Sequence, residues 1–228
     1  MQTLSKISET FLFITLSLIV SIVIISQAGA STLEIPMDVE YSNGTEPAGI
    51  SPWATATFVD KSPNIVTLTM SAANLVGSEF ISVWVFNFNP ILDPDLLSFS
   101  PVGTLLSGPN TISTGINAFK AGPSKYYDIK FDFPTSNGKS SNRFTAGESL
   151  VYDITYTGAG TINVSSFNFE STSGGGDGPY HSALHIQSIN PGDKSGWIGN
   201  TTVVPEPVSS LLFLSGGALL GFRRYRRT

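Results

Sequence analysis

The chain has 228 residues, of which 13% are charged and none is cysteine, and it contains 22 glycines, 14 prolines and 15 phenylalanines. A charged fraction well below the usual ~25% argues against coiled coils, helical bundles and acidic disordered tails, and it favours an all-β body. The formal net charge is -5, whereas nucleic-acid-binding proteins typically carry an excess of basic residues, so no nucleic acid partner is expected. The absence of cysteine excludes disulfide frameworks, thiolate metal sites and cysteine nucleophiles.

Residues 1–30 have the three-part layout of a secretory signal peptide. A polar stretch with Lys6 precedes an uncharged apolar run from Phe11 to Ile25, and Gln27-Ala28-Gly29-Ala30 follows that run. As a helix, the run would span only ~22 Å, against a hydrocarbon core of ~30 Å. Since Ala28 and Ala30 supply small residues at the -3 and -1 positions, we expect a signal peptidase to cleave after Ala30. An uncleaved N-terminal anchor is the alternative.

The C-terminus carries a second short apolar segment. Val204-Pro205-Glu206-Pro207 precedes an uncharged run from Val208 to Phe222, and the basic residues Arg223, Arg224, Arg226 and Arg227 follow that run. By the positive-inside rule, this cluster holds the tail in the cytoplasm while everything before the run is exported. The run is marginal as an anchor and follows a rigid Pro-x-Pro element, which is typical of a segment that is removed. A plain C-terminal transmembrane anchor is the alternative.

This order of Val-Pro-Glu-Pro, apolar helix and arginine cluster resembles the PEP-CTERM sorting signal of Gram-negative bacteria. The resemblance covers residues 204–228 and coincides with an N-terminal signal peptide. It implies an exosortase as the processing partner and a transient stay in the inner membrane. A sortase substrate would carry a Leu-Pro-x-Thr-Gly box, which the sequence lacks, and a GPI signal would end without arginines.

The exported body, residues 31–203, shows period-2 alternation between turn signals. The predicted strands are Ala54–Val59, Ile65–Ser71, Phe80–Phe88, Tyr126–Phe133, Leu150–Thr157 and Thr161–Glu170. The nearly continuous apolar run of residues 80–88 predicts a central strand that is buried on both faces. Residues 89–122 contain several prolines and glycines, so a long excursion is expected there. Many short strands joined in this way predict one antiparallel β-sandwich, with a jelly roll as the alternative.

Several blocks of the body look like blocks that recur in secreted PEP-CTERM proteins of unassigned role. They are Leu68–Leu75, Phe80–Pro90, His185–Ile189 and Ser195–Gly199. This second resemblance extends over most of the chain and implies a family rather than an activity.

His181 and His185 are the two histidines, and their i, i+4 spacing would place them on one face of a strand or helix. Zinc hydrolysis would require a glutamate directly after the first histidine, where Ser182 stands. Together with Asp177 or Asp193 the pair could hold a divalent metal, but a histidine satisfied within the sheet is the commoner outcome. We expect His185, which lies in a recurrent block, to hydrogen-bond backbone between sheets.

Other candidate chemistry is weak. Two segments have a composition that suits calcium: Asp93-Pro94-Asp95 and the glycine-rich loop 174–178. Neither has the alternating acidic residues of an EF-hand loop, so ordinary turns are expected. Nothing selects a catalytic carboxylate pair among Glu148, Asp153 and Glu170, and no Gly-x-Ser-x-Gly elbow is present. Trp53 and Trp197 could stack on sugar rings from the surface, whereas Trp84 belongs to the core. No catalytic, cofactor-binding or metal-binding residue is therefore predicted, and no cofactor.

The sequence thus predicts a non-enzymatic exported protein, sorted to the cell surface or the extracellular matrix and associated with exopolysaccharide. A carbohydrate-active or metal-dependent enzyme displayed by the same route is the alternative. Three segments follow from this interpretation: a signal peptide (1–30), a β-sandwich (31–203) and a sorting signal with one transmembrane helix (204–228).

Overall fold

The computed structural model describes residues 30–105, 107–123, 125–138, 142–173 and 178–205. The chain divides into two units, Met1–Ala30 and Ser31–Thr228, and the elements given below belong to the second. Ala28 and the apolar run of the predicted signal peptide lie outside the described residues, as does the predicted sorting signal from Glu206 onward, with Pro207, Arg223, Arg224, Arg226 and Arg227. Within the described ranges, no helix has the length and apolar character needed to cross a membrane.

Strands and two short 3-10 helices make up the regular structure of the described residues. The strands are β1 (Thr32–Met37), β2 (Val39–Glu40), β3 (Ala54–Ser62), β4 (Ile65–Ser71), β5 (Phe80–Phe86), β6 (Leu97–Pro101), β7 (Thr111–Ala121), β8 (Lys125–Asp132), β9 (Phe144–Thr145), β10 (Ser149–Tyr156), β11 (Thr172–Ser173), β12 (Ser182–Ile189), β13 (Lys194–Gly199) and β14 (Val204–Pro205). The 3-10 helices are η1 (Pro94–Leu96) and η2 (Val164–Phe167).

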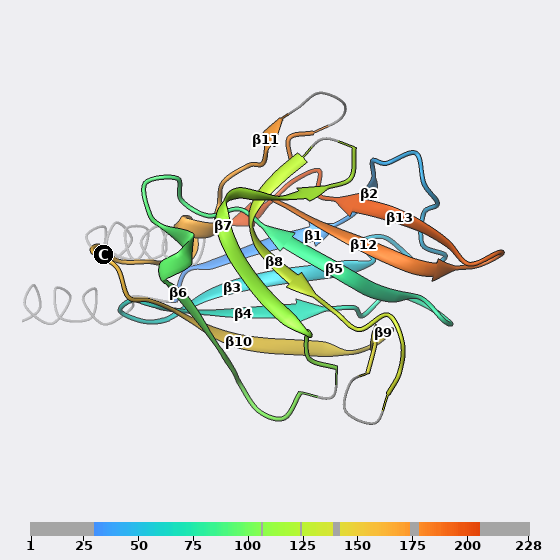
Figure 1. Cartoon of the computed structure of the whole chain (residues 1–228), viewed down its shortest axis with the longest axis horizontal. Coiled ribbons are helices and arrows are strands. Elements are labelled where there is room, and N and C mark those ends of the chain that lie inside the picture. Colours follow the sequence, from blue (N-terminus) through green and yellow to red (C-terminus); the bar gives the residue numbers. More distant parts are fainter. Residues whose placement is uncertain (1–29, 106, 124, 139–141, 174–177, 206–228) are drawn as a thin grey trace, which may run out of the picture. The chain divides into compact units, whose positions relative to one another are not determined.

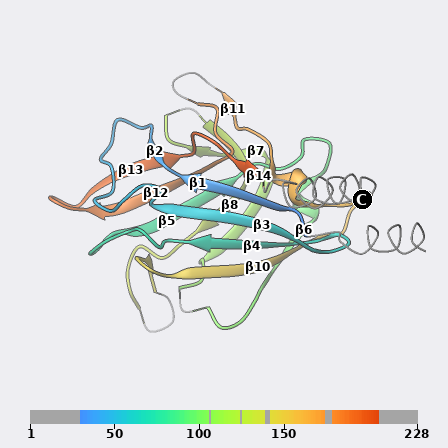
Figure 2. The ribbon, with the colours of Figure 1, turned by 180° about the vertical axis from the view of Figure 1, so that it is seen from behind.

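These strands form two antiparallel sheets that pack face to face, so the predicted β-sandwich is confirmed (Figure 1). The six-stranded sheet has the order β14-β1-β3-β4-β10-β6. The eight-stranded sheet has the order β11-β8-β5-β12-β13-β2, with β7 paired to β8 and β9 paired to β5. Figure 2 shows the six-stranded sheet from the other side, with β14 beside β1.

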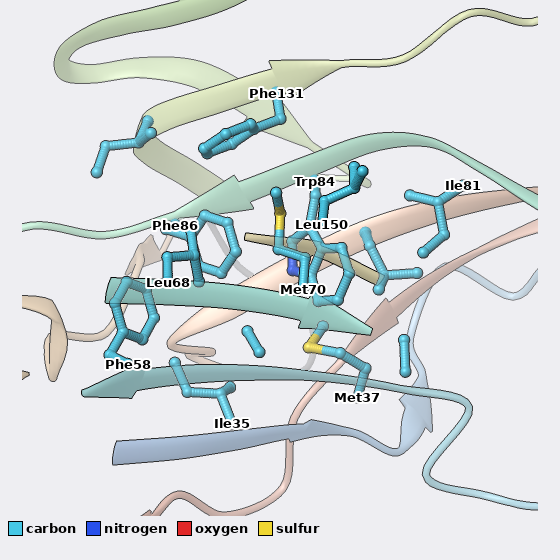
Figure 3. Close-up of a cluster of buried hydrophobic side chains, with 14 of the residues drawn as sticks. Ile35, Met37, Phe58, Leu68, Met70, Ile81, Trp84, Phe86, Phe131 and Leu150 are labelled. Atoms are coloured by element: carbon cyan, nitrogen blue, oxygen red, sulfur yellow. The ribbon is translucent and has the colours of Figure 1, made fainter. Parts of the chain in front are cut away.

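The main core fills the space between the two sheets (Figure 3). Trp84 and Phe86 of β5 point toward the six-stranded sheet, where Phe58 of β3 meets Phe86 edge to face at 5.5 Å. Each of these side chains is at most 1% exposed, and burying one contributes about 1.5–3 kcal/mol. As predicted, Trp84 belongs to the core.

The outer face of the eight-stranded sheet carries a smaller apolar cluster at one end. Because successive side chains of a strand point to opposite faces, Val85 faces away from the main core while its neighbours face into it. Two tyrosines of this cluster, Tyr41 and Tyr180, pack against each other with their ring centroids 4.6 Å apart. Its buried members are Tyr41, Val85, Ala121, Tyr127, Tyr180 and Ala183.

Five predicted strands are confirmed as β3, β4, β5, β8 and β10, with bounds that differ by at most a few residues. β5 is buried on both faces apart from half-buried Val83, as expected for a central strand. The predicted strand 161–170 is wrong, because η2 lies there instead. In η2, side chains bond to nearby backbone groups: the backbone N–H of Asn163 donates to Oγ of Ser166 at 3.2 Å. Such local hydrogen bonds compete with the backbone hydrogen bonds of a sheet.

The expected excursion over residues 89–122 is also wrong, because it contains β6 and β7. Alternation in β7 is interrupted where Gly115 and Asn117 adopt positive φ, and the pairing with β8 shifts register between Thr114 and Phe119. A bulge of this kind hides a strand from a period-2 search. The strands β1, β12 and β13 were not predicted either.

Candidate functional site

The outer face of the eight-stranded sheet carries a row of partly exposed side chains, which we call the outer row. Antiparallel register places His185 of β12 directly opposite both Trp197 of β13 and Val83 of β5. Val83 is opposite Asp132 of β8, which is in turn opposite Thr111 of β7. The outer row therefore crosses five strands, a span of about 19 Å at ~4.8 Å per strand.

An aromatic pair forms one end of the outer row. The rings of His185 and Trp197 stack with centroids 4.9 Å apart and an interplanar angle of 25°. Both side chains are half-buried, so the pair is packed against the sheet and still reaches solvent. A flat, fixed and partly exposed ring surface of this kind can stack on another flat group.

A β-bulge supplies the polar partners of His185. The pairing of β5 with β12 shifts register between His185 and Ile186, so Ser82 is the extra residue on β5. Its Oγ lies 3.0 Å from Nδ1 of His185 and accepts a hydrogen bond from Nε2 of Gln187 at 3.1 Å. Bulges commonly redirect a side chain in this way. The bulge therefore fixes the imidazole through its Nδ1.

The imidazole of His185 is best suited to act as a neutral polar group. Burial lowers its pKa below the ordinary value of 6.5, so the ring is uncharged at neutral pH. Among the described residues, Nε2 of His185 has no hydrogen-bond partner. The ring thus offers a stacking surface and one nitrogen that can bond to an external hydroxyl.

The other end of the outer row is charged but internally compensated. Nζ of Lys130 lies 2.8 Å from Oδ2 of Asp132, two residues along the same strand. The same ammonium group lies 5.4 Å from the ring centroid of Phe119. Because the two charges pair with each other, this end provides hydrogen-bonding groups without a strong net charge.

The pairing of Ser82 with His185 does not have the geometry of a nucleophile and its base. Ser82 is 4% exposed, and its hydroxyl also lies 3.2 Å from the carbonyl oxygen of His185, which it can donate to. A serine nucleophile requires an accessible hydroxyl and a carboxylate or similar group that orients the histidine from its other nitrogen. The pair therefore supports a positioning role for Ser82. Within the part of the chain that the structure describes, the ring of His185 does not bond to backbone across sheets as expected, because its Nδ1 lies beside the Ser82 hydroxyl instead.

His181 and His185 do not form a common site in the structure. His181 lies directly before β12, with Nδ1 3.4 Å from Nδ2 of Asn200. Burial lowers the pKa of His181, and the nearby carboxylate of Glu170 opposes that effect. Among the described residues no group of three or more histidine, aspartate or glutamate side chains is arranged to hold a metal ion. Asp193 is exposed, and Asp177 and glycines 174–176 lie outside the described residues.

The three carboxylates considered for glycosidic chemistry have separate environments. Glu148 accepts a hydrogen bond from the backbone N–H of Thr145 at 2.6 Å. Asp153 bonds to Lys61 and Thr67, and the hydrogen bond from Lys61 is the main cause of its lowered pKa. Glu170 is exposed at the rim of a pocket of about 140 Å³. No two of the three are brought together by these contacts.

That pocket has a buried carboxylate in its wall. Asp128 accepts one backbone hydrogen bond from Phe88 at 2.9 Å and another from Asn117 at 2.7 Å. Because each oxygen already holds a backbone N–H, Asp128 fixes the segment after β5 to the bulge of β7. Its contacts support a structural role.

The remaining predicted sites have ordinary structural roles. Asp93 caps η1, and its Oδ1 accepts the backbone N–H of Asp95 at 3.0 Å, as expected for a turn. Trp53 was predicted as a surface aromatic residue, but it is 5% exposed and donates from Nε1 to the carbonyl of Gly49. Trp197 is the tryptophan that reaches the surface.

The first two residues of the predicted sorting motif are part of the six-stranded sheet. Val204 pairs with Glu34 and Pro205 pairs with Leu33 in antiparallel register. The folded sheet therefore extends two residues past the boundary predicted after Val203.

Comparison of the chain with protein-family models, curated proteins and solved structures gave no match.

Proposed function

We propose that this chain is an exported, non-catalytic protein of the cell surface or extracellular matrix that binds polysaccharide through the outer row. The observation that carries this proposal is the stacked, half-buried pair of His185 and Trp197 on an open sheet face. A sugar ring has an apolar face that packs on an aromatic ring, and hydroxyl groups at its edge that need hydrogen-bond partners.

The rest of the outer row suits a chain-like ligand. Val83 offers apolar contact beside His185, and Asp132 and Thr111 offer polar groups further along. An extended row of this length fits several sugar units better than a single one. Because the protein carries a formal charge of -5, a neutral polysaccharide is favoured over an acidic one.

The sorting part of the proposal depends on the two ends of the sequence. A signal peptide ending at Ala30 directs export, and the Val204–Pro207 motif, apolar run and arginine cluster are the substrate of an exosortase. Processing would then place the sandwich at the surface or in the matrix, where polysaccharide is available.

Binding can be tested with the Trp197→Ala variant. We expect purified protein to bind a neutral polysaccharide in affinity gel electrophoresis, and the variant to bind at least about ten-fold more weakly, which corresponds to about 1.4 kcal/mol. Tyr126→Ala is the matched control, since Tyr126 is an aromatic residue with 38% exposure outside the outer row. Equal affinity of wild type and Trp197→Ala, with unchanged melting temperatures, would contradict the assignment of the site.

A further inference from the structure

The chain crosses between the two sheets at two corners that lie side by side. At the first corner, Asp38 joins β1 of the six-stranded sheet to β2 of the eight-stranded sheet. At the second, residues 200–203 join β13 of the eight-stranded sheet to β14 of the six-stranded sheet. The backbone N–H of Asp38 donates to the carbonyl of Gly199 at 3.0 Å, so the two crossings are bonded to each other.

The Asp38 carboxylate clamps the second crossing. Its Oδ1 accepts the backbone N–H of Thr201 at 2.8 Å, and its Oδ2 accepts the hydroxyl of Thr201 at 2.6 Å. Hydrogen bonds to a charged acceptor are stronger than those between neutral groups. We call Asp38 and Thr201 the corner clamp.

Asn200 and Val203 hold the same crossing from inside. Asn200 is 3% exposed, and its Oδ1 accepts the backbone N–H groups of His181 at 2.9 Å and Ser182 at 3.2 Å. Val203 packs against the main core. The segment that leads into the sorting motif is therefore fastened by several independent contacts, and it delivers Val204 and Pro205 onto the edge of β1.

From this arrangement we infer that the folded sandwich restrains its own C-terminal processing: β14 must leave the edge of β1 before a protease can take up the start of the motif. A protease binds its substrate as an extended strand through backbone hydrogen bonds, and pairing with β1 occupies those of Val204. The occupant of the β1 edge is thus the start of the proposed sorting motif, Val204 and Pro205. This inference rests on the proposed sorting function.

The first test is proteolysis of the purified full chain by thermolysin, which cleaves before valine. Asp38→Ala removes both bonds of the corner clamp, and we expect roughly ten-fold faster cleavage before Val203, with the strand contacts of the body intact. Asp153→Ala is the matched control, because Asp153 also bonds to a threonine hydroxyl but lies on β10, away from β14 in the same sheet. Asp38→Asn, which removes the negative charge and keeps one carbonyl acceptor, serves as a milder variant if Asp38→Ala folds poorly.

The second test follows conversion of precursor to processed form in the producing cell by pulse labelling and intact mass. Faster conversion of Asp38→Ala and Asp38→Asn than of wild type and Asp153→Ala is the expected result. The inference is contradicted if the Asp38 variants are cleaved by thermolysin at the wild-type rate. It is also contradicted if they are cleaved faster by thermolysin but converted in the cell at the wild-type rate. No conversion of the wild-type chain contradicts the proposed sorting function itself, and the restraint on processing fails with it.

Discussion

Both histidines are half-buried side chains whose pKa values are lowered mainly by burial. The folded state therefore binds fewer protons than the unfolded state once the pH falls toward the ordinary value of 6.5. Folding stability should accordingly be complete above that pH and should decrease as the pH falls below it. For His181 the nearby carboxylate of Glu170 opposes this effect of burial, because it favours the charged form of the ring.

We expect the melting temperature to fall between pH 7.5 and pH 5.5, a window in which ordinary carboxylates remain ionised. The double variant His181→Gln, His185→Gln should have a flatter profile over this range in differential scanning fluorimetry. A wild-type melting temperature that stays constant or rises on acidification would contradict the role of these two residues.

At the scale of single strands, β5 and β12 are joined through a buried serine. Oγ of Ser182 accepts the indole N–H of Trp84 at 2.9 Å and donates to the carbonyl of Val85 at 2.7 Å. Ser182→Ala leaves the indole N–H and one carbonyl lone pair without this partner in a fully buried position. We expect a loss of about 1–3 kcal/mol in the free energy of unfolding, measured by urea denaturation.

Ser100→Ala provides the comparison for that experiment, because Ser100 is an exposed serine in β6. Its replacement should change stability by less than about 0.5 kcal/mol. Equal effects of the two substitutions would show that the buried hydrogen bonds contribute nothing measurable.

The residue patterns of single strands explain which elements the sequence could predict. β4 is uninterrupted Ile-Val-Thr-Leu-Thr-Met with clear alternation, and its bounds agree with the prediction. β7 was not predicted, because the residues that form its bulge also interrupt the alternation of apolar and polar residues along the strand. Trp197 was a candidate on residue type alone. Ser82 and Asp132 were not, since their place beside His185 depends on a bulge and on cross-strand register, which local sequence does not determine.

For the whole molecule, the proposed function requires residues 204–207 to decide where the protein resides. Replacing Pro205, Glu206 and Pro207 by alanine removes the two residues with fixed φ and the carboxylate between them. We expect a slightly larger form to accumulate in the inner membrane, detected by fractionation and intact mass. Backbone pairing of residue 205 with β1 is compatible with alanine, so the sandwich should keep its melting temperature.

Truncation after Pro205 is the informative companion, because it retains β14 while removing the apolar run. This form should be found in the periplasm without sorting to the surface. Identical mass and location of the wild-type chain in hosts with and without an exosortase would show that the segment is only an anchor.

The position of Trp197 on β13 has a mechanical consequence. Only seven residues, Ile198 to Val204, separate this tryptophan from Pro205. If a polymer strand held on the outer face is pulled while the C-terminal segment is fixed, the tension runs along this short stretch and through the Asp38 and Asn200 contacts. Ile198 and Val203 on this stretch also pack in the main core, so a load on the attached polymer would strain this corner of the sandwich and would reach the core through these two residues.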